Sequence, residues 1–331
     1  MTATTSSPTR PAAIPQAGAR TPLTLRVTRV TQPAPDIRSL WLSDPDGRAL
    51  PSHPPGSHVV LHCGERRNAY SLTNAGSEPD HYAVSVLLRP DGAGGSRWIH
   101  EHARHGSLLR VDPPRSAFAP VVSARHHLLI AGGIGITPLL SHARAARAWN
   151  RSFTLLYGQR PGAAAHLDEL RTLCGPALET VQGRAALRER VLDQLGRQPL
   201  GTHLYVCGPA GLTDFVLEKA RRAGWPDERV HTERFEAAAL DPGRPFTARL
   251  ASTGRRVPVP SGTSLLSALE DAGSPVPSLC RQGVCGECRI GVRAGRPEHR
   301  DHYLSAEERS AGDSVMACVS RATDNELELD L

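Results

Sequence analysis

The sequence predicts a multidomain protein: an antiparallel β-barrel, then an α/β domain with a parallel sheet, then an α+β domain that holds a metal cluster. Three observations support this prediction. Short strand-like runs separated by turn residues fill the first third of the chain, strand and helix patterns alternate in the middle, and four spaced cysteines lie in the last third. A length of 331 residues is enough for two or three domains.

Composition and charge exclude several classes of protein. The net charge of +6 is modest, and no dense basic run with interleaved aromatics indicates nucleic-acid binding. No apolar run is long enough to span a membrane, and the N-terminus lacks a signal-peptide pattern. We therefore expect a soluble cytoplasmic protein with reduced thiols. Residues 1–20 are rich in Thr, Ser, Pro and Ala, which predicts a disordered tail.

The predicted barrel begins near residue 23. Alternating or apolar runs at 25–30, 37–42, 58–63 and 82–88 are typical of strands, and turn residues separate them. One helix is expected at about 97–104. Closely spaced short strands of this kind favour a small antiparallel barrel.

Two stretches of the barrel are candidate binding elements. Arg67, Tyr70 and Ser71 bring a cation, an aromatic and a hydroxyl together at a strand end. Gly94-Gly95-Ser96 leads into the helix, and a glycine-rich turn at a helix N-terminus is suited to an anion. The residues alone leave open that Tyr70 is a core residue and that the glycines form a plain hairpin turn.

The middle third predicts a parallel sheet. An apolar strand at 128–131 precedes Gly132-Gly133-Ile-Gly135-Ile-Thr137-Pro138 and an amphipathic helix. A further strand at 204–206 ends in Cys207-Gly208-Pro209 before another helix. This is not the G-x-G-x-x-G fingerprint, but both turns lie at carboxyl ends of strands, where a parallel sheet binds its ligand.

The last third contains a C-x4-C-x2-C motif, made by Cys280, Cys285 and Cys288, and Cys318 follows after 29 intervening residues. This is the plant-type spacing for a [2Fe–2S] cluster. Gly283 and Gly286 allow the loop to wrap closely around the cluster. A zinc site usually has two C-x2-C pairs, and a disulfide framework suits a short secreted chain, so neither alternative fits as well.

Together these motifs resemble the phthalate dioxygenase reductase and vanillate demethylase reductase family. The resemblance extends from about residue 23 to residue 331 and includes Glu298-His-Arg-Asp301 and Met316-Ala-Cys318-Val-Ser-Arg321. The family has a flavin barrel, a pyridine-nucleotide domain and a C-terminal plant-type ferredoxin domain. The boundaries expected here are a tail at 1–20, an FMN-binding β-barrel at 21–121, an NAD(P)-binding domain at 122–238, a linker at 239–245 and a [2Fe–2S] ferredoxin domain at 246–331.

The resemblance implies a flavin site. Tyr70 and Ser71 match the flavin-contacting Arg-x-Tyr-Ser motif, but its arginine falls on Asn68. Arg67, Arg89 or the N–H groups around Gly95 and Ser96 are the alternatives for the phosphate. Gly94-Gly95-Ser96 matches the element that binds the phosphate of FMN, and FAD is the less favoured flavin. Thr137 and Phe235 match residues near the flavin.

The resemblance also implies a nucleotide site. Gly132, Gly133, Gly135 and Thr137 match the loop on the nicotinamide side, and Cys207, Gly208 and Pro209 match the turn that faces the nicotinamide. After the strand at 153–158 the family often has an acidic residue, whereas this chain has Gln159-Arg160-Pro161. NADH is the expected donor, and Arg160 makes NADPH an alternative because it can meet a 2′-phosphate.

The implied function is electron transfer from NAD(P)H through FMN to the cluster and on to a separate Rieske oxygenase. The cofactors perform the chemistry, so no catalytic acid, base or nucleophile is expected among the side chains. The partner contact is expected to be transient and the chain monomeric. Two alternatives stay open: an FAD-containing reductase for a diiron hydroxylase, and a non-enzymatic redox-sensing flavin/iron–sulfur module.

Overall fold

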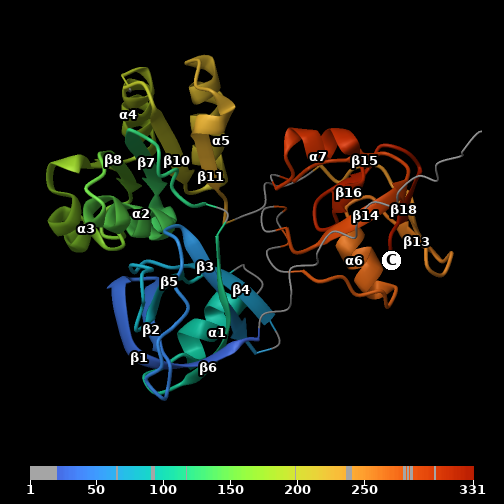
Figure 1. Cartoon of the computed structure of the whole chain (residues 1–331), viewed down its shortest axis with the longest axis horizontal. Coiled ribbons are helices and arrows are strands. Elements are labelled where there is room, and N and C mark those ends of the chain that lie inside the picture. The colour runs from blue at the N-terminus through green and yellow to red at the C-terminus, as the bar shows by residue number, and fades with distance from the viewer. Residues whose placement is uncertain are drawn as a thin grey trace, which may run out of the picture.

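The computed structural model contains three folded bodies (Figure 1). It describes residues 21–64, 66–90, 94–116, 118–197, 199–235, 241–278, 281, 283, 286–301 and 303–331. The predicted tail at 1–20 and the cysteines Cys280 and Cys285 lie outside the described residues. The barrel, in blue and teal, lies against the green and yellow parallel-sheet domain, and the third domain, in orange and red, lies to one side.

The first body is an antiparallel barrel. Its elements are β1 (Leu23–Ala34), β2 (Ile37–Ser43), β3 (Ser57–Cys63), β4 (Arg66–Ser71), β5 (Tyr82–Leu87), α1 (Gly95–His102) and β6 (Leu108–Ser116). The strand order is β4-β3-β6-β1-β2-β5. An antiparallel bridge between Leu72 and Val84 joins the end of β4 to β5, so the two edge strands meet. Closure removes the exposed edges of the sheet.

The second body is a parallel sheet with helices on both faces. Its strands are β7 (His126–Gly132), β8 (Phe153–Gln159), β9 (Leu178–Gln182), β10 (Thr202–Cys207) and β11 (Val230–Glu233). Its helices are α2 (Ile136–Ala148), α3 (Leu167–Cys174), α4 (Arg184–Gly196) and α5 (Ala210–Arg222), with short 3-10 turns η1 (Gly133–Gly135), η2 (Gly175–Ala177) and η3 (Asp227–Arg229). Alternate residues of β7 pack on opposite faces: Leu129 in the core that includes α2 and α3, and Ile130 in the core that includes α4 and α5.

The order of this sheet, β11-β10-β7-β8-β9, locates its binding crevice. The chain leaves β7 toward β8 and β9 and later returns to the other side of β7 with β10 and β11. The order therefore reverses between β7 and β10, and such a switch point opens a crevice at the carboxyl ends of the strands.

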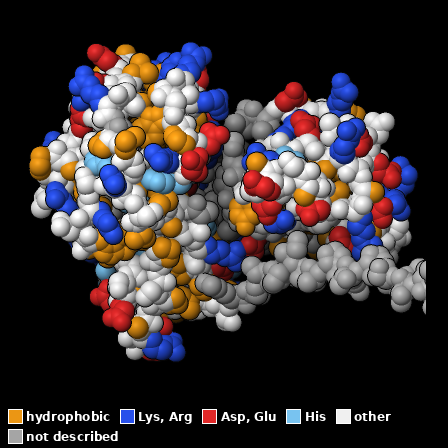
Figure 2. Space-filling view, turned by 45° about the horizontal axis from the view of Figure 1, so that its top comes forward, with side chains coloured by type: hydrophobic (Ala, Val, Ile, Leu, Met, Phe, Trp, Pro, Cys, Tyr) orange, Lys and Arg blue, Asp and Glu red, His pale blue; other side chains and the backbone are white. Residues whose placement is uncertain are grey.

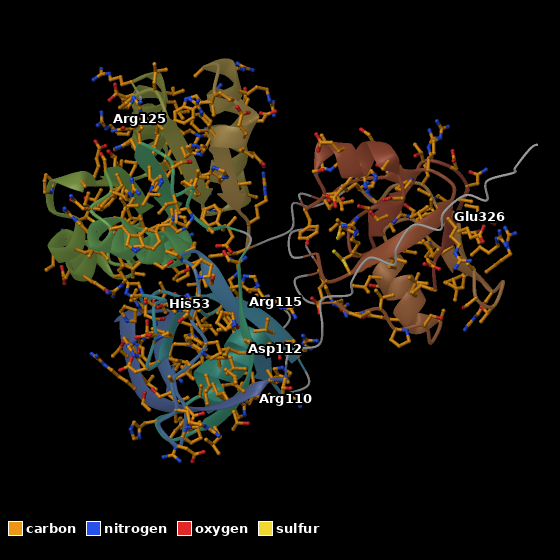
Figure 3. The ribbon with its side chains drawn as sticks, viewed as in Figure 1. His53, Arg110, Asp112, Arg115, Arg125 and Glu326 are labelled. Atoms are coloured by element: carbon orange, nitrogen blue, oxygen red, sulfur yellow. The ribbon has the colours of Figure 1, made fainter. Side chains whose placement is uncertain are left out.

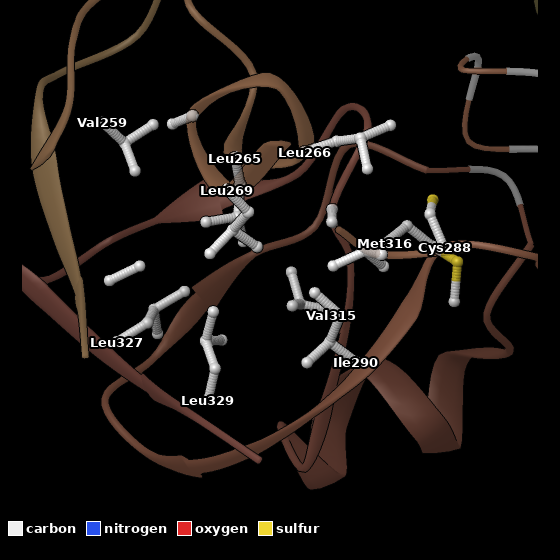
Figure 4. Close-up of a cluster of buried hydrophobic side chains, with 14 of the residues drawn as sticks. Val259, Leu265, Leu266, Leu269, Cys288, Ile290, Val315, Met316, Leu327 and Leu329 are labelled. Atoms are coloured by element: carbon white, nitrogen blue, oxygen red, sulfur yellow. The ribbon is translucent and has the colours of Figure 1, made fainter. Parts of the chain in front are cut away.

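The third body is an α+β domain. Its elements are β12 (Phe246–Leu250), β13 (Arg256–Val259), α6 (Leu265–Asp271), β14 (Arg289–Ala294), β15 (Pro297–Glu298), α7 (Ala306–Ala311), β16 (Ser314–Met316), β17 (Arg321–Ala322) and β18 (Glu326–Leu329). The mixed five-stranded sheet has the order β13-β12-β18-β14-β16. Helix α6 buries Leu265, Leu266 and Leu269 against it, and Cys288 and Met316 lie together at one edge of this core (Figure 4).

The barrel and the parallel-sheet domain share a core. Ala34 and Ile37 of the barrel pack in the same buried cluster as Leu139 of α2. The backbone N–H of Gly56 donates to the Ser141 hydroxyl at 2.9 Å. These two bodies are thus joined by continuous packing as well as by the chain.

The structure confirms the predicted fold class. Helix α1 begins at Gly95, two residues before the expected start. The strands β4, β6, β9, β11 and β14 to β18 were not predicted individually. Within the described part of the chain, no helix is long and apolar enough to cross a membrane.

We predict that Gly56→Ala disrupts the junction of barrel and parallel-sheet domain. Gly56 has φ +73°, and a Cβ there would lie 2.2 Å from the Phe118 carbonyl oxygen. The left-handed backbone and the clash together should cost about 2–4 kcal/mol of unfolding free energy. Gly47→Ala is the matched control, because Gly47 has φ +75° with no atom within 4 Å of its added Cβ. Denaturant titrations measure the unfolding free energy of each variant. An equal loss of unfolding free energy in the two variants would show that the close contact of Gly56 with Phe118 does not stabilise the junction.

Candidate cofactor-binding site

Two turns meet backbone to backbone at the switch point. A Cβ on Gly135 would lie 2.3 Å from the Cys207 carbonyl oxygen, and one on Gly208 would lie 3.1 Å from Gly132 Cα. Only glycine permits such an approach. The structure therefore brings the predicted residues Gly132, Gly135, Cys207 and Gly208 together.

The rim of this crevice is suited to a dinucleotide. Gly133 has φ +56° and open space where its Cβ would be. Helix α2 begins directly after this turn, and α5 begins after Pro209; neither has an acidic residue in its first turn. Backbone N–H groups at such helix starts attract phosphate. The buried Thr137 hydroxyl donates to the Ile134 carbonyl at 3.0 Å and so fixes the turn.

Glu233 at the end of β11 connects this crevice to the barrel. The Ser71 hydroxyl of β4 donates to Glu233 Oε2 at 3.4 Å. Glu233 is also the cross-strand neighbour of Cys207. Burial raises the pKa of Glu233 to about 8, although the hydrogen bond from Ser71 opposes the rise. Burial, together with Glu233, also raises the pKa of the Cys207 thiol well above its ordinary value. Both groups are protonated at neutral pH.

On the barrel side, a second group of candidate residues lies on β4 and at the start of α1. The Tyr70 hydroxyl is buried and has no hydrogen-bond partner within the described residues. A Cβ on Gly95 would lie 2.0 Å from Asn68 Oδ1, so the Asn68 side chain lies directly on the first turn of α1. The Arg66 guanidinium lies beside Gly94, because a Cβ there would be 3.6 Å from its Cζ. This turn has no acidic residue and no side-chain cap.

Arg67 has a partner within the barrel. Strand residues alternate between faces, so Arg66, Asn68 and Tyr70 share one face of β4 and Arg67 lies on the other. Arg67 donates to Asp112 Oδ2 at 2.7 Å, and His62 contacts the other carboxylate oxygen at 2.7 Å. The pKa of Asp112 is lowered: burial of the carboxylate acts to raise it, but the hydrogen bonds with His62 and Arg67 outweigh burial.

The remaining predicted residues are placed as follows. The Ser96 hydroxyl accepts from the Arg89 backbone N–H at 3.1 Å, so it is held in the same turn as Gly95. Phe235 packs against the core that contains α2. Arg160 is exposed just after β8, and the neighbouring Gln159 has a buried amide oxygen without a partner in the described part of the chain.

Arg66, Gln159 and Glu233 are further candidates for the site that were not identified from the sequence. Arg66 has a recognisable signal: it lies four residues before Tyr70, and even spacing along a strand places both on one face. Glu233 and Gln159 each end a strand of the parallel sheet, where ligands bind. The position of Glu233 at a strand end could not be recognised from the sequence, because β11 is only four residues long and was not predicted.

The described part of the cluster loop fits an iron–sulfur cluster. Cys288 and Cys318 are both buried, and the Ala317 N–H donates to the Cys288 carbonyl at 3.1 Å, which holds the two segments together. The Gly283 N–H donates to Cys318 Sγ at 3.2 Å. Arg281, Gly283 and Gly286 all have left-handed φ, as a tightly wrapped loop requires. Such N–H donors stabilise thiolates that carry a cluster.

Asp301 stabilises the residues that contact this loop. Its buried carboxylate accepts hydrogen bonds from the backbone N–H groups of Tyr303 and Leu304 and from the Ser320 hydroxyl. A Cβ on Gly286 would lie 2.3 Å from the Tyr303 ring, and one on Gly283 would lie 3.0 Å from Asp301 Cα. Gly283 and Gly286 are therefore packed closely against Asp301 and Tyr303.

The other cysteines have no sign of reactivity. Cys63 and Cys174 are buried, and burial raises the pKa of their thiols to about 12 and about 11. His62 contacts Asp112, and His100 contacts the Val86 carbonyl at 2.9 Å, so both imidazoles have structural partners.

Helix starts suited to phosphate on both a barrel and a parallel sheet, together with plant-type cysteine spacing in the same chain, are typical of an electron-transfer reductase. Comparison with known proteins agrees. Residues 107–230 match the N-terminal domain of DmmA-like dimethylamine monooxygenase subunits, and residues 248–323 match the 2Fe-2S iron–sulfur cluster binding domain.

Full-length relatives place the chain more closely. The β subunit of a haem-dependent oxidative N-demethylase from Ectopseudomonas mendocina is 42% identical over 93% of this chain and 99% of its own length. A vanillate O-demethylase oxidoreductase from a Pseudomonas species is 38% identical over 90% of this chain and 96% of its own. The solved structure of phthalate dioxygenase reductase matches with a TM-score of 0.72 and 35% identity, covering 94% of this chain and 98% of that one.

The chain belongs to the phthalate dioxygenase reductase family of flavin and iron–sulfur oxygenase reductases. It is an oxidoreductase that transfers electrons from a pyridine nucleotide through a flavin to a [2Fe–2S] cluster for an oxygenase.

We predict that Glu233→Gln removes a pH-dependent cost of folding. The pKa of Glu233 is raised by folding from 4.5 to about 8, so the folded protein retains a proton that the unfolded chain loses between these values. The wild-type protein should therefore lose unfolding free energy relative to the variant by at most about 1.4 kcal/mol per pH unit in this window.

The measurement is a series of denaturant titrations of both proteins between pH 5 and 9. The stability difference should grow as the pH rises to about 8 and then level off. A difference that does not change with pH would show that Glu233 is ionised in the folded protein.

Proposed function

We propose that this chain is the reductase subunit of a Rieske-type oxygenase or demethylase system, with FMN as its flavin and NADH as its main electron donor. The observation that carries the proposal is the contact between Ser71 and Glu233. It joins the flavin-side strand of the barrel to the carboxyl end of the nucleotide sheet, so a flavin ring beside Tyr70 and a nicotinamide beside Cys207 would share one site.

The residues fit this role. A nicotinamide supplies a hydride, a flavin accepts two electrons and releases them singly, and a [2Fe–2S] cluster carries one. Gly133 has nothing within 4 Å of the position of a Cβ, which would leave room beside this turn for the nicotinamide. Glu233 and Cys207 stay neutral, so the buried junction adds no negative charge. Tyr70, whose pKa burial raises, keeps a proton and an unused donor there.

FMN is favoured because the first turn of α1 offers a site for one terminal phosphate. That turn presents N–H groups after Gly94, has no acidic residue and is flanked by Asn68 and Arg66. We propose that Arg66 supplies the cation that the family motif would have at Asn68, because Arg67 is engaged with Asp112. Release of the flavin and measurement of its mass tests this choice, and recovery of FAD would refute it.

The adenosine end of the crevice is defined by Gln159 and Arg160. The Gln159 amide oxygen can accept a hydrogen bond from the ribose 2′-hydroxyl of NADH. Exposed Arg160 can pair with a 2′-phosphate, and no carboxylate lies at 158–165 to repel one. We therefore propose NADH as the main donor and NADPH as an accepted one.

The partner is proposed to be a separate terminal oxygenase that contains a Rieske centre. A second candidate is a haem-dependent N-demethylase, and it is favoured by the 42% identity to the β subunit of such an enzyme. Both would receive electrons one at a time from the cluster domain. Figure 2 shows acidic and basic side chains interspersed on the visible face of that domain, as suits a transient contact. We propose a cytoplasmic monomer, since a cluster with thiolate ligands suits a reducing compartment.

Anaerobic reconstitution tests the partner. The reductase is mixed with NADH and either a Rieske oxygenase or a haem-dependent N-demethylase, and reduction of each acceptor is followed by its absorbance. Fast reduction of the Rieske centre supports the proposal, and reduction of the haem alone supports the second candidate. Reduction of neither would refute the reductase role toward these classes.

We predict that Cys318→Ser separates the two halves of electron transfer. The loss of one cluster ligand should lower NADH-dependent reduction of cytochrome c by at least about tenfold, while reduction of ferricyanide through the flavin persists. Cys174→Ser is the control, because Cys174 is buried in the nucleotide domain. Normal cytochrome c reduction by the Cys318 variant would show that another residue is the fourth ligand.

We predict that Arg160→Ala changes nucleotide preference. Loss of a cation that meets the 2′-phosphate should lower kcat/KM for NADPH by about tenfold and leave that for NADH within about twofold. Steady-state ferricyanide reduction with each nucleotide measures the ratio. An equal fall in kcat/KM for NADPH and NADH would show that Arg160 does not contact the 2′-phosphate of NADPH.

A further inference from the structure

An ion pair joins the barrel to the cluster loop. Arg115 lies near the end of β6, on the side of the barrel that faces the third domain (Figure 3), and its guanidinium donates to Glu287 Oε2. Glu287 directly precedes Cys288 and follows Cys285 by two positions. The pair therefore reaches into the C-x2-C segment of the predicted cluster site.

A row of paired residues connects Arg115 to the flavin side of the barrel. His58 of β3 is the cross-strand partner of both Ser71 on β4 and Arg115 on β6. Neighbouring strands lie about 4.8 Å apart, so the backbone of Arg115 is about 10 Å from that of Ser71. Ser71 in turn contacts Glu233 at the junction of barrel and nucleotide sheet. The ion pair thus links the cluster loop to β6, and β6 is two strands away from β4, which carries the Ser71 contact to Glu233.

Two hydrogen bonds hold the end of the connecting segment. Arg300 donates to the Asp241 carbonyl at 2.5 Å and Arg321 to the Arg244 carbonyl at 2.9 Å, so the end of the connecting segment is held on the third domain itself. Between the described residues of the barrel and those from Phe246 onward, Arg115–Glu287 is the one hydrogen-bonded ion pair. This pair can therefore set the orientation of the described part of the cluster loop relative to the barrel.

We propose that Arg115 is a positioning residue that, by pairing with Glu287, docks the cluster loop on the barrel and sets the path from flavin to cluster. The inference rests on the proposed function for the direction of electron flow. The side chains of Arg115 and Glu287 are 32% and 20% exposed. Partial burial limits screening by salt, yet both ions retain water, so the contact orients the domains without locking them permanently.

Charge reversal tests the proposal. Arg115→Glu, Glu287→Arg and the double variant are loaded with flavin and cluster, mixed anaerobically with NADH and followed by stopped-flow absorbance. Flavin reduction should stay within about twofold of wild type in all three, because the nucleotide crevice is untouched. Cluster reduction should slow by about tenfold or more in each single variant and recover to within about threefold in the double variant.

Small-angle scattering provides a readout that does not depend on electron transfer. Each single variant should have a larger radius of gyration than the wild type, and the double variant should regain the wild-type value. Arg249→Glu is the control: Arg249 pairs with Glu328 within the third domain at exposures of 40% and 19%, and should change neither measurement.

Unchanged cluster reduction and scattering in both single variants would overturn the proposal, and so would a double variant that does not recover. Failure of the proposed function has a different signature: neither NADH nor NADPH would reduce the flavin of the wild-type protein.

Discussion

The close contact between two glycine turns is the constraint on which the site depends. Gly132 against Gly208, and Gly135 against Cys207, allow the carboxyl ends of β7 and β10 to approach without side chains between them. The chain reverses its strand order at this point, so these contacts border the crevice that a parallel sheet offers to a nucleotide. The barrel then docks on the same region, through the Gly56 contact to Ser141 and the Ser71 contact to Glu233.

The ionisable groups around this crevice are neutral where they are buried and positively charged at its margins. Two buried groups beside the crevice are neutral, because the pKa of Glu233 is raised to about 8 and that of the Cys207 thiol well above its ordinary value. Cations lie at the margins instead, with Arg66 beside α1 and Arg160 after β8. A neutral interior with positive margins is suited to cofactors whose phosphates are anionic and whose reacting rings are buried.

Features set by local sequence could be predicted, and those set by distant pairing could not. The cysteine spacing, the glycine turns and the strand–helix alternation are local, and the fold class follows from them. The choice between Arg66 and Arg67 depends on the register of β4, because a shift of one residue exchanges the faces of a strand. Glu233 acquires its raised pKa only through the pairing of β10 with β11 and the approach of Ser71. Arg115 and Glu287 are 172 residues apart, and no local pattern relates them.

An anaerobic titration with NADH tests most directly whether the three bodies carry electrons in succession. The holoprotein is titrated while flavin absorbance is recorded, and samples are frozen for electron paramagnetic resonance. We expect NADH to bleach the flavin, and the signal of a reduced [2Fe–2S] cluster then to appear without any added mediator. A flavin that is reduced while the cluster stays oxidised, or a protein in which neither nucleotide reduces either cofactor, would contradict it.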